Sequence, residues 1–335
     1  MSMDGQDPTR VIARAALQIG LGIAVGAVLL WLAFRSVDLD EVRGVFSAIS
    51  REWIFAAVIL YFCALFIRII RWWLILREAV PLRIRQVAAA LLAGYAVNAL
   101  LPARLGELFR ADFCRRQYGA SRTVVLGTIM VERFTDGIIV LCALAVGILA
   151  VKTDSGSLRI LQFLLGSGAV VFGALGATLV LLGSRRVARL VTGVLDRYPF
   201  LAARFGALSE SMKLVKSRRM VAILSTSLLI WLADGGALWC VLRACGVSLD
   251  LFGMCLVVGV VSLSTLLPSP PGFLGTMQFA FVLSVTILGY SSPQGLAAAL
   301  ANQIFLLGSM VTVGLILLLV TYSRRFTATM RANRR

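Results

Sequence analysis

Long apolar blocks constrain this chain more than any other feature of its sequence. A helix of roughly 20 apolar residues crosses the ~30 Å hydrocarbon core of a bilayer, and six blocks reach about that length, at residues 15–34, 53–76, 123–151, 160–182, 221–242 and 295–320. The chain is 59% hydrophobic and 15% charged, whereas soluble domains average roughly 45–50% and about 25%. The sequence therefore predicts an all-α polytopic membrane protein with about six full transmembrane helices.

The basic residues indicate how these helices are oriented. The formal net charge is +17, and most lysine and arginine residues lie between the apolar blocks, as the positive-inside rule predicts for cytoplasmic segments. This distribution favours an orientation signal over nucleic-acid binding. We expect a cytoplasmic tail at 1–14, one membrane domain at 15–321 and a basic cytoplasmic tail at 322–335, in the cytoplasmic (bacterial inner) membrane.

The longest connection, at 184–220, is also the most basic. Its apolar residues recur at helical spacing, which suits an amphipathic helix in the inner headgroup layer. An ordinary cytoplasmic loop fits the same residues equally well.

Two further apolar stretches are interrupted by proline. At a constant offset of 166 residues, the first stretch aligns with the second without a gap, and Leu100, Leu101, Pro102, Gly106 and Leu108 match Leu266, Leu267, Pro268, Gly272 and Leu274. Proline ends a helix because it lacks an N–H and clashes with the preceding turn. We therefore predict two re-entrant or broken helix hairpins, at 87–118 and 251–289. Three spans separate them, so they should enter from opposite sides as an inverted repeat, as in many secondary transporters.

The returning half-helices give these breaks their chemistry. A helix N-terminus carries unpaired N–H groups and about half a positive charge, so it attracts phosphate or carboxylate. Two such ends meeting at mid-membrane predict a site for an anionic lipid headgroup. The residues assigned to this site are Asn98, Pro102, Arg104, Gly106, Arg110, Arg133, Pro271, Gly272, Gly275 and Gln278.

Charged residues inside the apolar blocks are the second signal, because each costs at least ~2.5 kcal/mol on membrane-insertion scales. Glu132 and Asp136 lie four residues apart on one helix face and should repel unless a cation, Arg104 or Arg110, lies between them. We assign Glu107, Glu132, Asp136 and Asp234 to a charge network or to proton coupling. A purely structural ion-pair network is the alternative. We expect Arg68, Arg71, Trp72 and Trp73 to be interfacial anchors.

Metal and cofactor chemistry finds little support in the sequence. The chain has no histidine, and its six cysteines form no C-x-x-C pair, which removes the commonest metal ligands and the commonest acid–base group. We expect neither a metal nor a cofactor.

Taken together, four motifs carry a family resemblance that extends over almost the whole chain. They are Arg68-x-x-Arg71-Trp72, Asn98-x-x-x-Pro102-x-Arg104-x-Gly106-Glu107-x-x-Arg110, Glu132-Arg133-x-x-Asp136 and Pro271-Gly272-x-x-Gly275. In this order they resemble the flippase-like transmembrane domain of lysylphosphatidylglycerol synthases, which also occurs alone. The resemblance differs at Phe273 and Gln278, where the family commonly has a second glycine and a glutamate.

The resemblance implies a lipid flippase-like transporter without the synthase's aminoacyltransferase domain, and we expect no lysine transfer by this chain. The implied substrates are anionic or lipid-linked lipids: aminoacyl-phospholipid, polyprenyl-phosphate or hopanoid-type lipids. Two alternatives stay open, a non-transporting membrane partner of a lipid-modifying synthase and an intramembrane transferase. The expected partners are the lipid substrate, the bilayer and such a synthase, and a homodimer is also compatible.

Overall fold

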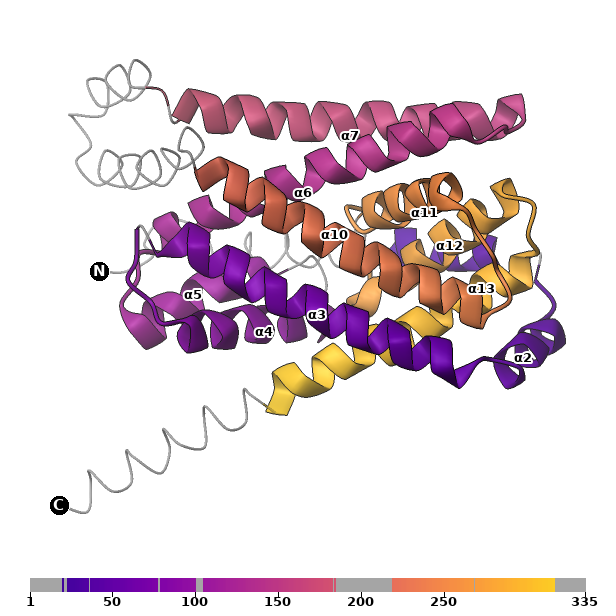
Figure 1. Cartoon of the computed structure of the whole chain (residues 1–335), viewed down its shortest axis with the longest axis horizontal. Coiled ribbons are helices and arrows are strands. Elements are labelled where there is room, and N and C mark those ends of the chain that lie inside the picture. Colours follow the sequence, from indigo (N-terminus) through magenta and orange to yellow (C-terminus); the bar gives the residue numbers. More distant parts are fainter. Residues whose placement is uncertain are drawn as a thin grey trace.

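The computed structural model describes residues 20, 23–35, 37–77, 79–100, 105–182, 184, 219–267 and 269–316. Within these residues all regular structure is helical (Figure 1). A helix over Ile23–Phe34 is followed by α2 (Leu39–Ser47), α3 (Arg51–Leu76), α4 (Ile84–Leu100), α5 (Gly106–Tyr118), α6 (Arg122–Ala150), α7 (Ser155–Leu182), α10 (Arg219–Ala244), α11 (Leu251–Ser264), η3 (Pro271–Phe273), α12 (Thr276–Ile287), α13 (Ser292–Ala301) and the π-helix η4 (Asn302–Leu307).

Five of the described helices are long and apolar enough to cross a membrane. They are α3, α6, α7, α10 and the continuous helix Ser292–Ile316, which contains α13 and η4. The prediction of an all-α polytopic membrane protein is thus confirmed. The first predicted span is described only over Ile23–Phe34. The predicted tails at 1–14 and 322–335, and almost all of the connection at 184–220, lie outside the described residues.

One predicted boundary is wrong. The sequence assigned residues 152–159 to a loop, but α7 already begins at Ser155. The reason is a side-chain cap, because the Asp154 carboxylate accepts hydrogen bonds from the N–H groups of Gly156 and Ser157, at 2.8 and 3.0 Å. Such a cap satisfies donors that a helix start leaves free.

The long helices form layers. Helix α3 packs along α10, α6 packs against both α7 and α11, and α7 lies at the outside of the bundle (Figure 1). Glycines allow α6 and α11 to approach closely, since a Cβ on Gly259 would lie 2.6 Å from the Cβ of Leu144, and one on Gly147 would lie 2.6 Å from the Leu256 nitrogen. Small residues serve this purpose in membrane helix pairs, where close van der Waals contact replaces the hydrophobic driving force.

The first hairpin consists of α4 and α5. Helix α4 has 17 residues, and at 1.5 Å per residue it is about 25 Å long, too short to span the core. The two arms of the hairpin, α4 and α5, meet at Gly94 and Gly106, where a Cβ on Gly106 would lie 2.0 Å from the Gly94 carbonyl oxygen. Pro102 and Arg104, which the sequence placed at the break, lie outside the described residues.

The second hairpin consists of α11, η3 and α12. Helix α11 has 14 residues. The chain then turns, and three residues of the turn have positive φ angles: Gly272 (69°), Phe273 (59°) and Gly275 (85°). Gly275 also lies against the N-terminal helix, since a Cβ there would be 2.0 Å from the Gly26 carbonyl oxygen. Because η3 intervenes, α12 begins later than the gapless alignment of Gly106 with Gly272 predicts.

The hairpins lie toward opposite ends of the bundle, α4–α5 near the end of α3 and α11–α12 near the end of α10 (Figure 1). Their broken regions nevertheless meet, because η3 packs against α4. A Cβ on Gly272 would lie 3.9 Å from the Ala99 carbonyl oxygen. The order long, short, short, long in α3 to α6 recurs in α10, α11, α12 and the continuous helix Ser292–Ile316. The inverted relation of the two halves stays a prediction.

Candidate functional site: a polar cavity between the two helix breaks

A cavity of about 520 Å³ lies where the two hairpins meet. Residues from both hairpins and from α3, α6, α7, α10 and η4 line it. Most of its wall is apolar, but seven polar or charged side chains of the network and the breaks face it: Arg68, Asn98, Glu107, Arg133, Asp136, Asp234 and Asn302. It is therefore a largely apolar chamber with ion pairs in its wall.

The innermost ion pair joins Arg110 of α5 to Glu132 of α6. Both side chains are 1% exposed, and the Arg110 Nη2 and Nη1 atoms lie 3.1 and 3.3 Å from the two Glu132 carboxylate oxygens. The Arg110 guanidinium also lies over the Trp72 ring, 3.9 Å from its centroid. The sequence predicted that Arg110 would pair with the carboxylates of Glu132 and Asp136, and this prediction is confirmed for Glu132. Neither Arg110 nor Glu132 lines the cavity.

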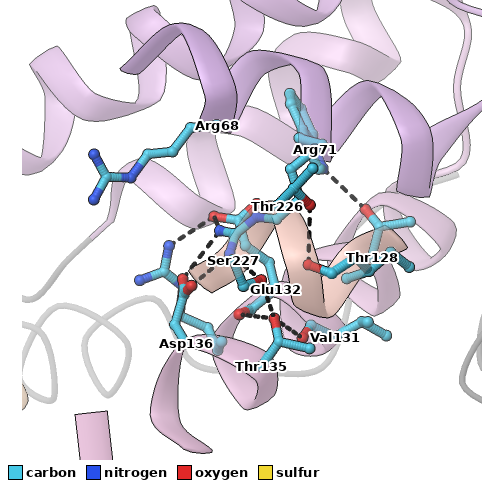
Figure 2. Close-up of polar contacts among 12 residues, drawn as sticks. Arg68, Arg71, Thr128, Val131, Glu132, Thr135, Asp136, Thr226 and Ser227 are labelled. Carbon is cyan, nitrogen blue, oxygen red and sulfur yellow. Dashed lines mark hydrogen bonds and ion pairs between the residues drawn. The ribbon is translucent and has the colours of Figure 1, made fainter. Parts of the chain in front are cut away.

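Arg71 of α3 supplies the second buried cation (Figure 2). Its Nη2 atom lies 3.1 Å from an Asp136 oxygen and 3.8 Å from a Glu132 oxygen, and its Nη1 atom donates to Ser227 Oγ at 2.8 Å. Arg71 is therefore the cation between the two carboxylates that the helix spacing required.

This burial corrects the assignment of Arg71 and Trp72 as interfacial anchors. Their exposed fractions are 1% and 0%, so neither side chain lies on the outer surface where it could contact lipid headgroups. Trp72 instead donates through Nε1 to Thr128 Oγ1 at 3.2 Å. Trp73 is only partly buried, with its Nε1 donating to the Leu82 carbonyl at 3.2 Å and the Arg77 guanidinium over its ring, and its assignment as an anchor stays a prediction.

Arg68 also turns inward. It forms a bidentate pair with Asp234 of α10, with Nη1 lying 3.2 Å from Oδ1 and Nη2 bonded to Oδ2. Both side chains line the cavity, so the expected snorkelling of Arg68 is replaced by an ion pair that joins α3 to α10. Trp231 of α10 adds a hydrogen bond from Nε1 to Asp136 Oδ1, at 3.2 Å.

The most accessible pair of the network joins Arg133 to Glu107. Their side chains are 32% and 26% exposed, the Arg133 Nε atom lies 3.4 Å from Glu107 Oε1, and both residues line the cavity. Arg133 Nη2 also donates to Glu132 at 2.7 Å. Arg133 thus connects the buried pair to the chamber.

The described network balances its charges. Its four arginines are Arg68, Arg71, Arg110 and Arg133, and its four carboxylates are Glu107, Glu132, Asp136 and Asp234. Within this described network, an anionic ligand would therefore share an arginine with a carboxylate. Arginine permits this, because it has five N–H donors in a planar fork.

Uncharged amides hold the helix breaks. Asn98 Oδ1 accepts from the Gly106 N–H at 2.6 Å, and Gln278 Oε1 accepts from the Gly275 N–H at 2.7 Å. The sequence predicted that these helix starts would offer free N–H groups to a ligand, but these two donors are already satisfied within the protein. Backbone groups freed at membrane depth need such partners.

Gln303 of η4 completes the second break, and the sequence analysis missed it. Its Oε1 accepts from Gln278 Nε2 at 2.7 Å, and its Nε2 donates to the Gly272 carbonyl at 2.9 Å. The sequence signal for Gln303 is the polar pair Asn302-Gln303 inside an apolar block.

The predicted headgroup residues are therefore divided. Asn98 and Arg133 line the cavity, whereas Gly106, Arg110, Pro271, Gly272, Gly275 and Gln278 do not. Gln278 is 1% exposed and uses both its oxygen and its nitrogen within the protein, so it does not reach a headgroup in the cavity in this structure. Of the predicted charge network, Glu107, Asp136 and Asp234 line the cavity.

Comparisons with known proteins agree with this architecture. A protein from Haloferax volcanii named "Glycosyltransferase AglD" is 27% identical, over 88% of this chain and 52% of its own length. The chain thus spans about half the length of this relative. No solved structure matches significantly. The family model described as "Lysylphosphatidylglycerol synthase TM region" matches residues 19–332, and the chain belongs to this family.

Proposed function

We propose that this protein is a flippase-like transporter that moves an anionic or lipid-linked lipid across the cytoplasmic membrane. The observation that carries the proposal is the cavity of about 520 Å³, walled by apolar side chains and ion pairs, between two helix breaks in a membrane bundle. Charged residues at this depth are costly, so they indicate a functional site more often than lipid-facing residues do.

Arg133 is the residue best placed to hold a headgroup phosphate. It is the most exposed arginine among the described ion pairs inside the bundle, and its nearest cavity-side partner, Glu107, is itself partly exposed. Arg68, bidentate to Asp234, is the second cavity-lining arginine. A phosphate entering the chamber would exchange with one carboxylate at such an arginine, because both ligands fit the guanidinium fork.

The hydrocarbon tails have a separate route. Two cavity-lining residues, Val171 of α7 and Leu266 after α11, are 54% and 40% exposed. The chamber therefore reaches the apolar outer surface of the bundle at these residues, where lipid tails would lie. This arrangement supports transport with the headgroup inside the protein and the tails in the bilayer.

Proton coupling would use the carboxylates that face the cavity. Glu107, Asp136 and Asp234 each line it and each pair with an arginine. Exchange of an anionic headgroup for one of these carboxylates at its arginine is the step to which proton movement would be coupled. This coupling is part of the proposal, as are the cytoplasmic placement of both termini and the membrane in which the protein resides.

Reconstituted vesicles test the proposal. The purified protein should speed the transbilayer movement of tail-labelled phosphatidylglycerol above the rate in protein-free vesicles, and Arg133→Gln should remove that gain. Arg115→Gln is the matched control, since Arg115 is an exposed arginine of α5 that does not line the cavity. No acceleration of phosphatidylglycerol, an aminoacylated lipid or a prenyl phosphate would contradict the proposal.

The relative named a glycosyltransferase favours a second candidate. This chain would then act as the membrane partner of a lipid-modifying enzyme, or carry out a transfer itself. Product formation in membranes that contain only this protein would support a transferase. Co-purification of a synthase, together with loss of its lipid product when this chain is deleted, would support a partner role.

A further inference from the structure

Phe273 is the one residue other than glycine with a positive φ, 59°, among the described residues. A side chain with a Cβ is disfavoured in this region, whereas glycine adopts it freely. Residues kept in such conformations cluster where function requires them. Its preceding neighbour, Gly272, has a similar φ of 69°, so the chain at this turn uses a glycine at one position and a phenylalanine at the next.

The surrounding contacts hold Phe273 in this conformation. Its N–H donates to the Pro270 carbonyl at 3.2 Å, and its carbonyl accepts from the Thr276 hydroxyl at 3.1 Å. The Gln303 side chain fixes the preceding carbonyl, that of Gly272. The backbone is thus restrained on both sides of Phe273.

Phe273 belongs both to the edge of the hydrophobic core and to the wall of the chamber. Phe273 lines the cavity, whereas Pro271, Gly272 and Gly275 of the same break do not. Gly272 lies against Ala99 at the end of α4, next to Asn98, and both Ala99 and Asn98 line the cavity. Phe273 is therefore the side chain of the second break that limits the cavity space beside the end of α4.

We propose that Phe273 selects lipids by headgroup size, excluding bulky headgroups and admitting anionic phospholipids with small ones. This inference rests on the proposed function and deepens it. A glycine at position 273 would satisfy the backbone and leave more room, so the ring, not the turn, sets the limit.

Three anionic lipids of increasing headgroup size test the inference: tail-labelled phosphatidic acid, phosphatidylglycerol and phosphatidylinositol. In reconstituted vesicles, Phe273→Ala and Phe273→Gly should both raise the rate for phosphatidylinositol relative to phosphatidic acid by at least about tenfold, the lower end of what one methylene changes in the selectivity of an apolar pocket. Leu274→Ala is the matched control, because Leu274 is an exposed neighbour outside the cavity lining, and it should keep the wild-type ratio.

The outcomes separate the ring from the backbone. A changed ratio in both variants supports size selection. A change in Phe273→Gly alone points to relief of the backbone, and unchanged ratios in both point to no role in selection; either result overturns the inference. If the wild-type protein moves none of these three lipids, the lipids that co-purify with each variant decide on Phe273. The proposed function itself fails only if an aminoacylated lipid and a prenyl phosphate are not moved either. If Phe273→Ala co-purifies with more phosphatidylinositol than the wild-type protein does, size selection is supported. If the co-purified lipids are unchanged, the inference is overturned.

Discussion

The two helix breaks solve the same backbone problem with different chemistry. At the first, Asn98 accepts from the N–H of Gly106. At the second, Gln278 accepts from the N–H of Gly275. Around the first break, α5 and α6 bring Glu107, Arg110, Glu132 and Arg133 into ion pairs. At the second break, the partner of Gln278 is another amide, Gln303.

This difference indicates a division of labour. An amide that holds a backbone donor keeps a broken helix intact without placing charge in the membrane, where charge is costly. The ion pairs of the first break do more than that, because Arg133 and Glu107 reach the cavity. We infer that the first break supplies recognition of the headgroup and that the second supplies shape, through Phe273.

The largest expected effect concerns the buried core of the first break. Glu132→Ala removes the carboxylate that pairs with Arg110 among the described residues, and it also removes a neighbour of Arg71. Breaking a buried ion pair in this way costs about 3–5 kcal/mol. We expect poor yield and a clear fall in the thermal unfolding temperature in detergent. Arg115→Ala, at an exposed position of α5, is the control, and a wild-type unfolding temperature for Glu132→Ala would contradict the network's structural role.

The next largest effect is the loss of stability when either of the two amide side chains that cap the breaks is removed. Asn98→Leu and Gln278→Leu each leave a backbone N–H at a break without its side-chain acceptor, and an unsatisfied buried donor costs about 1–3 kcal/mol. Thermal unfolding should show similar losses for the two variants. A large loss for one and none for the other would show that the breaks are not held in the same way.

A double-mutant cycle sharpens the account of the second break. Gln278 donates to Gln303, and Gln303 donates to the Gly272 carbonyl. The losses for Gln278→Leu and Gln303→Leu should therefore not add, with a coupling energy of roughly 0.5–3 kcal/mol for residues in one network. Additive losses in the unfolding free energy would contradict the amide bridge.

The smallest effect on stability is expected for Arg133→Gln. This side chain is partly exposed, and partly exposed ion pairs contribute about 1 kcal/mol or less. The unfolding temperature should change little while transport of phosphatidylglycerol is lost. A fall as large as that of Glu132→Ala would place Arg133 in the structural core rather than in the recognition site.

Much of the fold could be predicted because membrane helices are encoded locally. Block length identified the spans, proline with a short apolar run identified both hairpins, and the i, i+4 spacing of Glu132 and Asp136 required a cation. Arg71, the second cation, was missed because arginine and tryptophan at the end of a span fit an interface as well as a core. Only the packing of α3 against α6 and α10 distinguishes these two environments.

Other features depend on contacts between distant segments. The amide bridge joins Gln278 to Gln303, which lie 25 residues apart, and no local pattern connects them. The positive φ of Phe273 follows from the turn that it occupies, and its sequence signal was only a departure from the family's usual glycine.

The central claim is that the cavity between the breaks takes a lipid headgroup. A high-resolution cryo-EM map of the protein in nanodiscs containing phosphatidylglycerol tests it directly. The account predicts headgroup density in the cavity against Arg133, with tails leaving past Val171 and Leu266. A cavity without lipid density, with phosphatidylglycerol bound only around the outside of the bundle, would contradict it.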